Sequence, residues 1–303
     1  MFTSPFRPAD RVAAEPATPV ALDGHDLVLR YGGRTVVHGV SIALEPGRAT
    51  ALVGPNGSGK STLLRALSRL HKVDDGRITL GRATDDGAEV RPGAGAGAGT
   101  DGPRGRDAAL LSARQFAREV TLFSQSRPAP QGLTVTEVVA FGRHPYRRGF
   151  AGPSAEDRAA VERAMGVTGV RGMADRPVGE LSGGEMQRVW LAACLAQDTG
   201  VVLLDEPTNH LDLRYQVETL DLVRDLVEDH GIAAGIVLHD LDQASRVADT
   251  LVLMRAGRVH AMGKPVDVLT AENIREVYDI GVEVGVDPRT GRLRIDPIGR
   301  HPV

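Results

Sequence analysis

Hydrophobic and polar residues alternate along the first part of the chain. In residues 25–29 and 35–44 apolar side chains recur at every second position, which is the period of a strand with one buried face. Gly32 and Gly33 stand between the two stretches and can adopt the backbone conformations that a tight turn needs. The pattern therefore predicts a β-hairpin near the N-terminus.

Four later runs are almost wholly apolar, which is typical of strands buried on both faces of a parallel sheet. These runs cover residues 49–53, 120–123, 201–204 and 232–238. Between the last two runs, residues 213–229 carry valine and leucine at helical spacing. Strands that alternate with helices predict an α/β fold whose mostly parallel sheet is covered by helices.

Helical patterns gather before residue 185, and less regular segments flank the predicted core. Apolar spacing in residues 134–142, in residues 155–165 and around Arg171 predicts a helical subdomain at about residues 126–185. We also expect a flexible arm at residues 1–22, a disordered glycine-rich insertion at 83–107, and a C-terminal hairpin or tail at 281–303.

Composition limits the function classes only broadly. The 303 residues are 42% hydrophobic, which is enough for one large α/β core. The net charge of −3 gives no broad basic field, so nucleic acid is not an expected partner. The single cysteine, Cys194, excludes an internal disulfide framework. Without a secretory signal pattern or a run of about 18 apolar residues, we expect a cytoplasmic protein.

The segment GPNGSGKST lies between a predicted strand and a predicted helix. Its glycines let successive backbone N–H groups point inward around an anion, and the positive end of the helix faces the same point. The lysine can approach the β- and γ-phosphates of ATP, and the next serine can ligate Mg²⁺. The predicted nucleotide-binding residues are Gly54, Pro55, Asn56, Gly57, Ser58, Gly59, Lys60, Ser61 and Thr62.

Polar residues at the ends of other predicted strands complete the candidate site. Asp205 ends an apolar strand at the sheet edge where such folds bind ligands, so we expect it to hold Mg²⁺ together with Ser61. Glu206 is the candidate general base for the attacking water. His239 also follows a buried strand and is expected to face the same crevice.

Gln125 and Tyr31 are two further candidates. Gln125 follows a strand and precedes a Ser-Arg-Pro stretch, which suits a side chain that reaches Mg²⁺ and the attacking water. Tyr31 precedes the phosphate loop and can stack on adenine through its ring face. The alternatives are an ordinary loop glutamine and an ordinary tyrosine at a strand end.

Together with LSGGEMQR at residues 181–188, these motifs resemble the nucleotide-binding subunits of ABC transporters. The resemblance runs over roughly residues 26–280 and implies an ABC ATPase domain at residues 23–280. It implies that Tyr31 stacks on adenine, that Gln125 is the Q-loop glutamine and that His239 is the switch histidine. Asp205 and Glu206 match the Walker B motif, and residues 209–212 match the D-loop.

The resemblance also implies partners. The signature residues Ser182, Gly183, Gly184 and Glu185 of one subunit complete the ATP site of a second copy. Integral membrane permease subunits and, indirectly, a substrate-binding protein follow from the same family, which places the chain at the cytoplasmic face of a membrane. Residues 143–146 fall where such subunits meet the permease, and the alternative for them is a polar surface loop.

Several phrases, among them FGRHPYRR at residues 141–148 and HDLDQASRVAD at residues 239–249, are similar to ATPases of iron-siderophore importers. Haem and cobalamin remain alternative cargoes. A soluble ABC ATPase outside transport is the alternative of a different class, although such proteins usually carry two cassettes or a long coiled coil. A regulator without turnover is a third reading, and the presence of Glu206, His239 and Gln125 argues against it.

Overall fold

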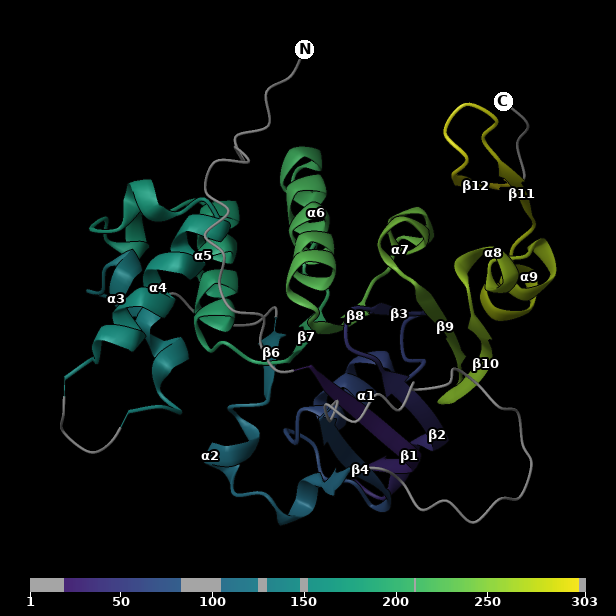
Figure 1. Cartoon of the computed structure of the whole chain (residues 1–303). Helices are drawn as coiled ribbons and strands as arrows, with labels where there is room; N and C mark the ends of the chain where they lie inside the picture. The colour runs from purple at the N-terminus through teal and green to yellow at the C-terminus, as the bar shows by residue number, and fades with distance from the viewer. Residues whose placement is uncertain (1–18, 83–104, 125–129, 148–151, 210, 300–303) are drawn as a thin grey trace.

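The computed structural model describes residues 19–82, 105–124, 130–147, 152–209 and 211–299. Gln125, most of the predicted insertion and most of the predicted N-terminal arm lie outside the described residues. The described chain forms three parts in Figure 1: a two-sheet core, a helical part beside it, and a small C-terminal hairpin on the other side.

The central sheet has the strand order β10-β9-β3-β8-β7-β6. Its strands are β3 (Ala49–Val53), β6 (Val120–Ser124), β7 (Val201–Asp205), β8 (Ala233–Val237), β9 (Thr250–Arg255) and β10 (Arg258–Gly263). Five strands run parallel, and β10 is antiparallel to β9. The four apolar runs of the sequence thus form β3, β6, β7 and β8, which confirms the predicted parallel sheet.

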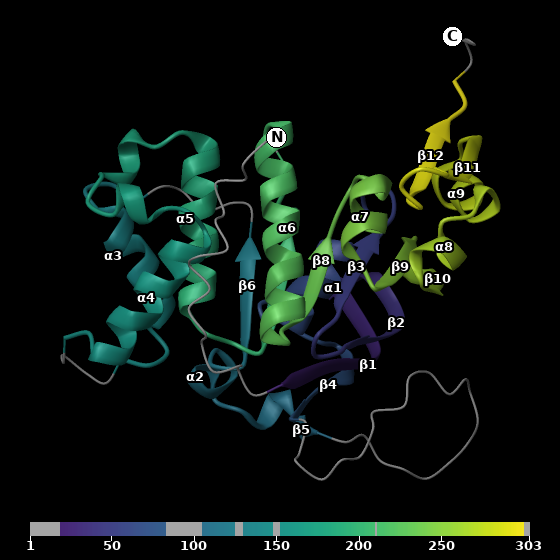
Figure 2. The same cartoon turned by 45° about the horizontal axis from the view of Figure 1, so that its top comes forward.

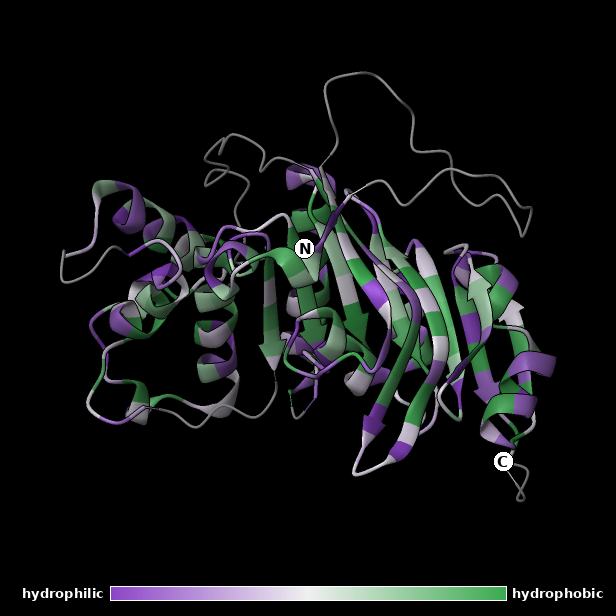
Figure 3. Ribbon diagram, turned by 90° about the horizontal axis from the view of Figure 1, so that it is seen from below, coloured by the Kyte–Doolittle hydropathy of each residue, from purple (hydrophilic) through white to green (hydrophobic). Residues whose placement is uncertain are grey.

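The sheet is buried on both faces because its side chains alternate between two hydrophobic cores. Ala51 and Val53 of β3 pack into the core that contains α6 (Leu213–His230), whereas Leu52 packs into the core that contains α1 (Lys60–Leu67). Figure 3 shows the resulting band of hydrophobic residues along the central strands. The two layers hold the carboxyl ends of β3, β7 and β8 at one edge.

A second, antiparallel sheet covers α1 and has the order β2-β1-β4-β5. It contains β1 (Val20–Tyr31), β2 (Arg34–Leu44), β4 (Asp75–Arg82) and β5 (Arg106–Asp107), and the short helix α2 (Ala113–Phe116) follows it. The hairpin of β1 and β2 is confirmed, with Gly32 and Gly33 both at positive φ.

The predicted ends of the flexible arm, at residue 22, and of the disordered insertion, at residue 107, were wrong. Val20 already pairs with β4, so residues 20–22 belong to the sheet because Val20 and Leu22 are buried there. Residues 106 and 107 also pair with β4, and they are therefore not part of a disordered insertion.

The helical part has its own hydrophobic core and contains α3 (Val135–Val139), α4 (Ala155–Val167) and α5 (Gly183–Ala196). Short 3-10 turns cover Ala140–Arg143, Arg171–Met173 and Val178–Glu180. The helices begin at Thr134, Ser154 and Ser182, each of which forms a capping box with the residue three positions later. Because α5 extends to Ala196, this part continues beyond the predicted end at residue 185.

The C-terminal segment returns along the other side of the core. It contains α7 (Leu241–Val247), α8 (Pro265–Val268), α9 (Ala271–Tyr278) and a separate hairpin of β11 (Val282–Val286) and β12 (Leu293–Pro297). Figure 2 shows this hairpin at the opposite end of the molecule from α3 and α4. The hairpin confirms the sequence prediction, whereas α7, β9, β10, α8 and α9 were not predicted.

Candidate functional site

The phosphate loop connects β3 to α1 through backbone conformations that require glycine. Gly54, Gly57 and Gly59 have φ values of +145°, +79° and +99°. A Cβ on Gly54 would lie 2.2 Å from the carbonyl oxygen of Met254, so no other residue fits without displacing β9. The strand, the loop and the helix therefore form the anion-binding turn that the sequence predicts. We call this turn, at residues 54–62, the phosphate cradle.

Lys60 lies inside this cradle and is buried. Its Nζ donates to the carbonyl oxygens of Gly54 at 2.8 Å and of Pro55 at 3.1 Å. Burial lowers the pKa of Lys60, while the carboxylates of Glu206 and Asp205 act in the opposite direction. The ammonium group is therefore held at the centre of the loop, where it can neutralise an anion.

The cradle also contains hydrogen-bond donors that have no acceptor in the described part of the chain and could bind an anion. The Ser58 hydroxyl is buried and has no hydrogen-bond partner among the described residues. Gly59 stands at the N-terminus of α1 and offers no side-chain cap, which leaves the N–H groups of the first turn for another acceptor. A buried hydroxyl, a helix N-terminus and a lysine together match the oxygens of a polyphosphate.

Asp205 ends β7 beside the phosphate loop and is buried. One oxygen, Oδ1, accepts a hydrogen bond from Ser61 Oγ at 2.7 Å. The other, Oδ2, lies 3.7 Å from Nη2 of Arg65. The structure thus brings a hydroxyl and a carboxylate together, and both are oxygen ligands of the type that Mg²⁺ takes.

Glu206 follows Asp205 and has a left-handed backbone with φ of +55°. Its Oε1 lies 2.5 Å from Nε2 of His239, which follows the neighbouring strand β8. Its Oε2 accepts a hydrogen bond from the Asn209 side chain. Non-glycine residues adopt this conformation less often than glycine does. The carboxylate is held from two sides at the mouth of the cradle.

Tyr31 ends β1 and is 48% exposed. Its ring stacks on the His71 imidazole with a centroid separation of 4.4 Å and an interplanar angle of 32°. One face of the tyrosine is therefore covered by His71. An exposed aromatic ring held in this way can offer its remaining surface to a planar base.

The predicted signature residues lie at the start of α5. Ser182 caps this helix, and its hydroxyl donates to Oε2 of Glu185 at 2.9 Å. Hydrogen bonds from Ser182 hold the pKa of Glu185 below its usual value, and Nη1 of Arg176 lies 3.3 Å from the same carboxylate. Among the described residues, no hydrogen bond or ion pair joins residues 181–185 to the phosphate loop of the same chain.

Within residues 143–146, for which the sequence left a polar surface loop as the alternative, Arg143 is not a surface residue. Arg143 is only 1% exposed, and its Nε donates to Oδ1 of the buried Asp157 at 2.8 Å. The guanidinium also covers the Tyr146 ring at 3.8 Å and donates to the carbonyl of Ala196. Phe141, two residues before Arg143, is 49% exposed. The contacts of Arg143 hold the backbone here, and the segment therefore presents an apolar side chain at the surface.

Sequence reasoning missed Arg65, His71 and the Arg143–Asp157 pair. Arg65 could have been found, because it stands four residues after Ser61 and therefore on the same face of α1. Neither the stacking of His71 nor the pairing of Arg143 has a local signal, because both depend on tertiary packing.

Known proteins are similar to this chain over most of its length. The ABC transporter family matches residues 37–209. The ferric enterobactin transport ATP-binding protein FepC of Escherichia coli is 38% identical over 92% of this chain and 94% of its own length. The chain belongs to the ATP-binding proteins of ABC transporters. As an ABC transporter ATP-binding protein it is an ATPase, and ATP is the nucleotide that its family binds.

Other similarities agree with this ABC family membership. The hemin import ATP-binding protein HmuV of Streptomyces coelicolor is 41% identical over 97% of this chain and 95% of its own length. The ATP-binding cassette MJ1267 in its ADP conformation has a TM-score of 0.70, 23% identity and coverage of 86% of this chain and 99% of its own. That structural likeness confirms the predicted fold class. Within the described residues, no helix combines the length and apolar character needed to cross a bilayer.

Proposed function

We propose that this chain is the ATP-hydrolysing subunit of an importer for ferric siderophores. ATP hydrolysis by this chain is supported above all by the Glu206 carboxylate. It is held between His239 and Asn209 at the sheet edge where the phosphate cradle lies. The cargo assignment is supported by relatives whose names specify ferric enterobactin, achromobactin and petrobactin transport, at 36–38% identity over 92–93% of this chain.

In this proposal, the phosphates of ATP bind to the loop that runs from Gly54 to Thr62. The Lys60 ammonium exchanges its two carbonyl acceptors for phosphate oxygens, and the Ser58 hydroxyl gains its missing partner. Tyr31 stacks on the adenine ring. These contacts hold the γ-phosphate near Glu206, because the loop follows β3 and Glu206 follows β7 at the same edge of the sheet.

We assign Mg²⁺ binding to Ser61, Asp205 and Gln125. The observed hydrogen bond between Ser61 and Asp205 places two suitable oxygens together. The assignment of Gln125 rests on the sequence motif alone. A bound Mg²⁺ supplies charge neutralisation for the phosphates during transfer.

Glu206 acts as the general base in this scheme. Its carboxylate orients the attacking water and accepts a proton from it, while His239 and Asn209 fix the direction of the carboxylate oxygens. His239 lies at the exposed side of the pair, where it can also contact the γ-phosphate. Proton transfer to a positioned base contributes at least about 10²-fold to a rate.

A second copy of the chain is the proposed partner at the ATP site. Ser182, Gly183, Gly184 and Glu185 of that copy would offer a hydroxyl and helix N-terminal donors to the γ-phosphate. A structure with the same fold, MJ0796, a bacterial ABC transporter cassette with a TM-score of 0.64, is dimeric, which supports a dimer of this chain. Membrane permease subunits would bind the face that exposes Phe141, and a substrate-binding protein would act through them.

Hemin is the second candidate cargo. The 41% identity to the hemin import protein HmuV extends over 97% of this chain, which favours it specifically. In either case the ATPase would lie at the cytoplasmic face of the membrane and would not touch the cargo.

The catalytic proposal is tested with Glu206→Gln, with Glu283→Gln on the exposed strand β11 as a matched control. We expect Glu206→Gln to retain ATP binding and to lose at least about 10²-fold in hydrolysis. The control should keep both properties. Lys60→Ala should lose nucleotide binding itself, measured with labelled ATP. Undiminished hydrolysis by Glu206→Gln would remove this residue from its role.

A further inference from the structure

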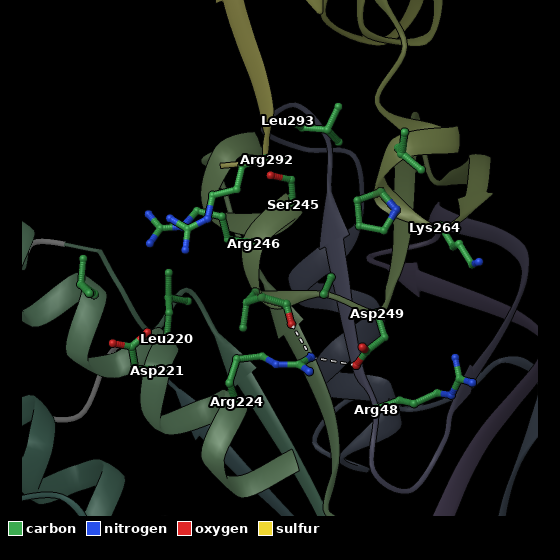
Figure 4. Close-up of a pocket in the computed structure, with 16 residues that line it drawn as sticks. Arg48, Leu220, Asp221, Arg224, Ser245, Arg246, Asp249, Lys264, Arg292 and Leu293 are labelled. Atoms are coloured by element: carbon green, nitrogen blue, oxygen red, sulfur yellow. Dashed lines mark hydrogen bonds and ion pairs between the residues drawn. The ribbon is translucent and has the colours of Figure 1, made fainter. Parts of the chain in front are cut away.

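A second hollow lies at the opposite edge of the central sheet from the phosphate loop. Its volume is about 690 Å³, within the range of pockets that hold small organic molecules. Arg48, which lines it, directly precedes β3, whereas the phosphate loop directly follows β3. Figure 4 shows the hollow between α6, α7, the start of α8 and the loop that joins β11 to β12.

The lining of the pocket combines apolar and charged groups. Its apolar part includes Val217, Leu220, Val247, Val266 and Leu293. Its charged part consists of Arg48, Asp221, Arg224, Arg246, Asp249, Lys264 and Arg292. Cationic side chains therefore outnumber carboxylates here, although the whole chain has a net charge of −3.

Two of these arginines already have partners. Arg224 Nη1 lies 2.9 Å from Oδ2 of Asp249, and the same oxygen accepts a hydrogen bond from the backbone N–H of Ala49. Arg48 pairs with Glu45 at 3.0 Å. These contacts join α6 and β3 to the segment before β9, and they leave Arg224, Arg48 and Asp249 with structural roles.

The other three cations are different. Within the described part of the chain, Arg246, Lys264 and Arg292 form no ion pair, and all three are exposed. Arg246 interacts with Asp242 only through longer-range electrostatics. In Figure 4 the Arg246 and Arg292 side chains extend toward the same side of the pocket. Like charges that line one concave surface repel each other and concentrate a positive field, which an anion would relieve.

We propose that this pocket binds a small organic polyanion, in which an apolar body carries two or more carboxylate or phosphate groups. The apolar lining would bury the body of the ligand. The guanidinium groups of Arg246 and Arg292 can each accept a planar carboxylate or phosphate in bidentate geometry, and Lys264 adds a point charge. In Figure 4 the guanidinium ends of Arg246 and Arg292 lie on the side of α6 and Lys264 lies across the pocket, so the charged groups of the ligand would bind at these two sides.

This site is separate from the proposed ATP site, and its ligand would tie the C-terminal hairpin to the catalytic core. Arg292 comes from the hairpin, Arg246 from α7 and Lys264 from the residue before α8. Binding should therefore reduce hydrogen exchange of the β11–β12 hairpin. The anion site and the ATPase assignment are tested independently, since neither uses residues of the other.

Isothermal titration of the full chain with benzene-1,3,5-tricarboxylate tests the proposal, with excess ADP present so that the phosphate loop is filled. The pocket variant is Arg246→Gln with Arg292→Gln. The control is Arg77→Gln with Arg289→Gln, which removes the same charge from exposed sites outside the pocket. Benzene-1,3,5-triyl tris(phosphate), titrated in the same way, distinguishes phosphate from carboxylate recognition.

We expect the native chain to bind at least one probe with an affinity that falls as salt is added. The pocket variant should bind about tenfold more weakly, and the control should stay within about twofold of the native chain. Equal melting temperatures of the two variants would verify that both fold. Absence of binding by the native chain, or an equal loss in both variants, would overturn the proposal.

Discussion

Replacement of Arg143 by Met tests the most deeply buried ion pair of the described structure. Arg143 is 1% exposed, and its hydrogen bond to Asp157 joins the 3-10 turn after α3 to the first turn of α4. Methionine keeps much of the side-chain length but removes the charge. Asp157 would then remain buried without its cationic partner. An uncompensated buried charge lowers the free energy of unfolding strongly.

The expected loss can be estimated from these contacts. Removing one partner of a buried pair typically costs about 3–5 kcal/mol. Asp157 would still accept a hydrogen bond from the backbone N–H of Ser154 at 3.0 Å, so we expect the lower end, about 3 kcal/mol. The variant also loses the contact of the guanidinium with the Tyr146 ring. Arg163→Met is the control, because its pair with Asp198 is exposed and contributes less than about 1 kcal/mol.

Urea unfolding followed by tryptophan fluorescence measures this effect. The single tryptophan, Trp190, packs against the core of the helical part and reports on its unfolding. The hydrogen bond from Arg143 holds the pKa of Asp157 below its usual value, so the pair stabilises the fold at neutral pH. That contribution disappears as the pH falls through the depressed pKa. The difference between native chain and variant should therefore shrink below about pH 4. A loss no larger than that of Arg163→Met would refute the reasoning.

Three further substitutions test individual contacts. Gly54→Ala should abolish ATP binding in a filter assay, since its Cβ would clash with the Met254 carbonyl; normal affinity would show that the loop can move aside. Tyr31→Ala should weaken ATP binding about two- to tenfold, whereas Tyr31→Phe should not; equal affinities in titrations of both would exclude stacking. Glu185→Ala should lose about 1 kcal/mol with the capping box at Ser182, and Glu185→Gln should lose less, because it keeps the side-chain acceptor but gives up the charge next to Arg176; equal melting temperatures of Glu185→Ala and the native chain would contradict the cap.

The sequence predicted the central sheet because buried parallel strands carry an unmistakable apolar signal. The runs that became β3, β6, β7 and β8 are apolar on both faces, as the two hydrophobic cores require. Residues 251–254 are also apolar but follow soon after a helix, and a short run of this kind is as compatible with a buried helix as with β9.

The site could be predicted where a motif fixes the backbone, and less well where contacts come from tertiary structure. The phosphate loop needs glycine at fixed positions, so its residues were identified with their positions in the fold. The approach of His239 to Glu206 depends on the pairing of β7 with β8, which the sequence implies only indirectly. The burial of Arg143 could not be predicted, because its partner Asp157 comes from the next helix.

The central claim is that ATP hydrolysis through Glu206 powers import of a ferric siderophore. The most direct measurement is the uptake of iron-labelled enterobactin in iron-limited cells that contain either the native chain or Glu206→Gln as the only copy, with labelled hemin as a parallel cargo. The proposal predicts enterobactin uptake with the native chain and none with the variant. Enterobactin uptake that is equal with both chains, or uptake of hemin alone, would contradict it.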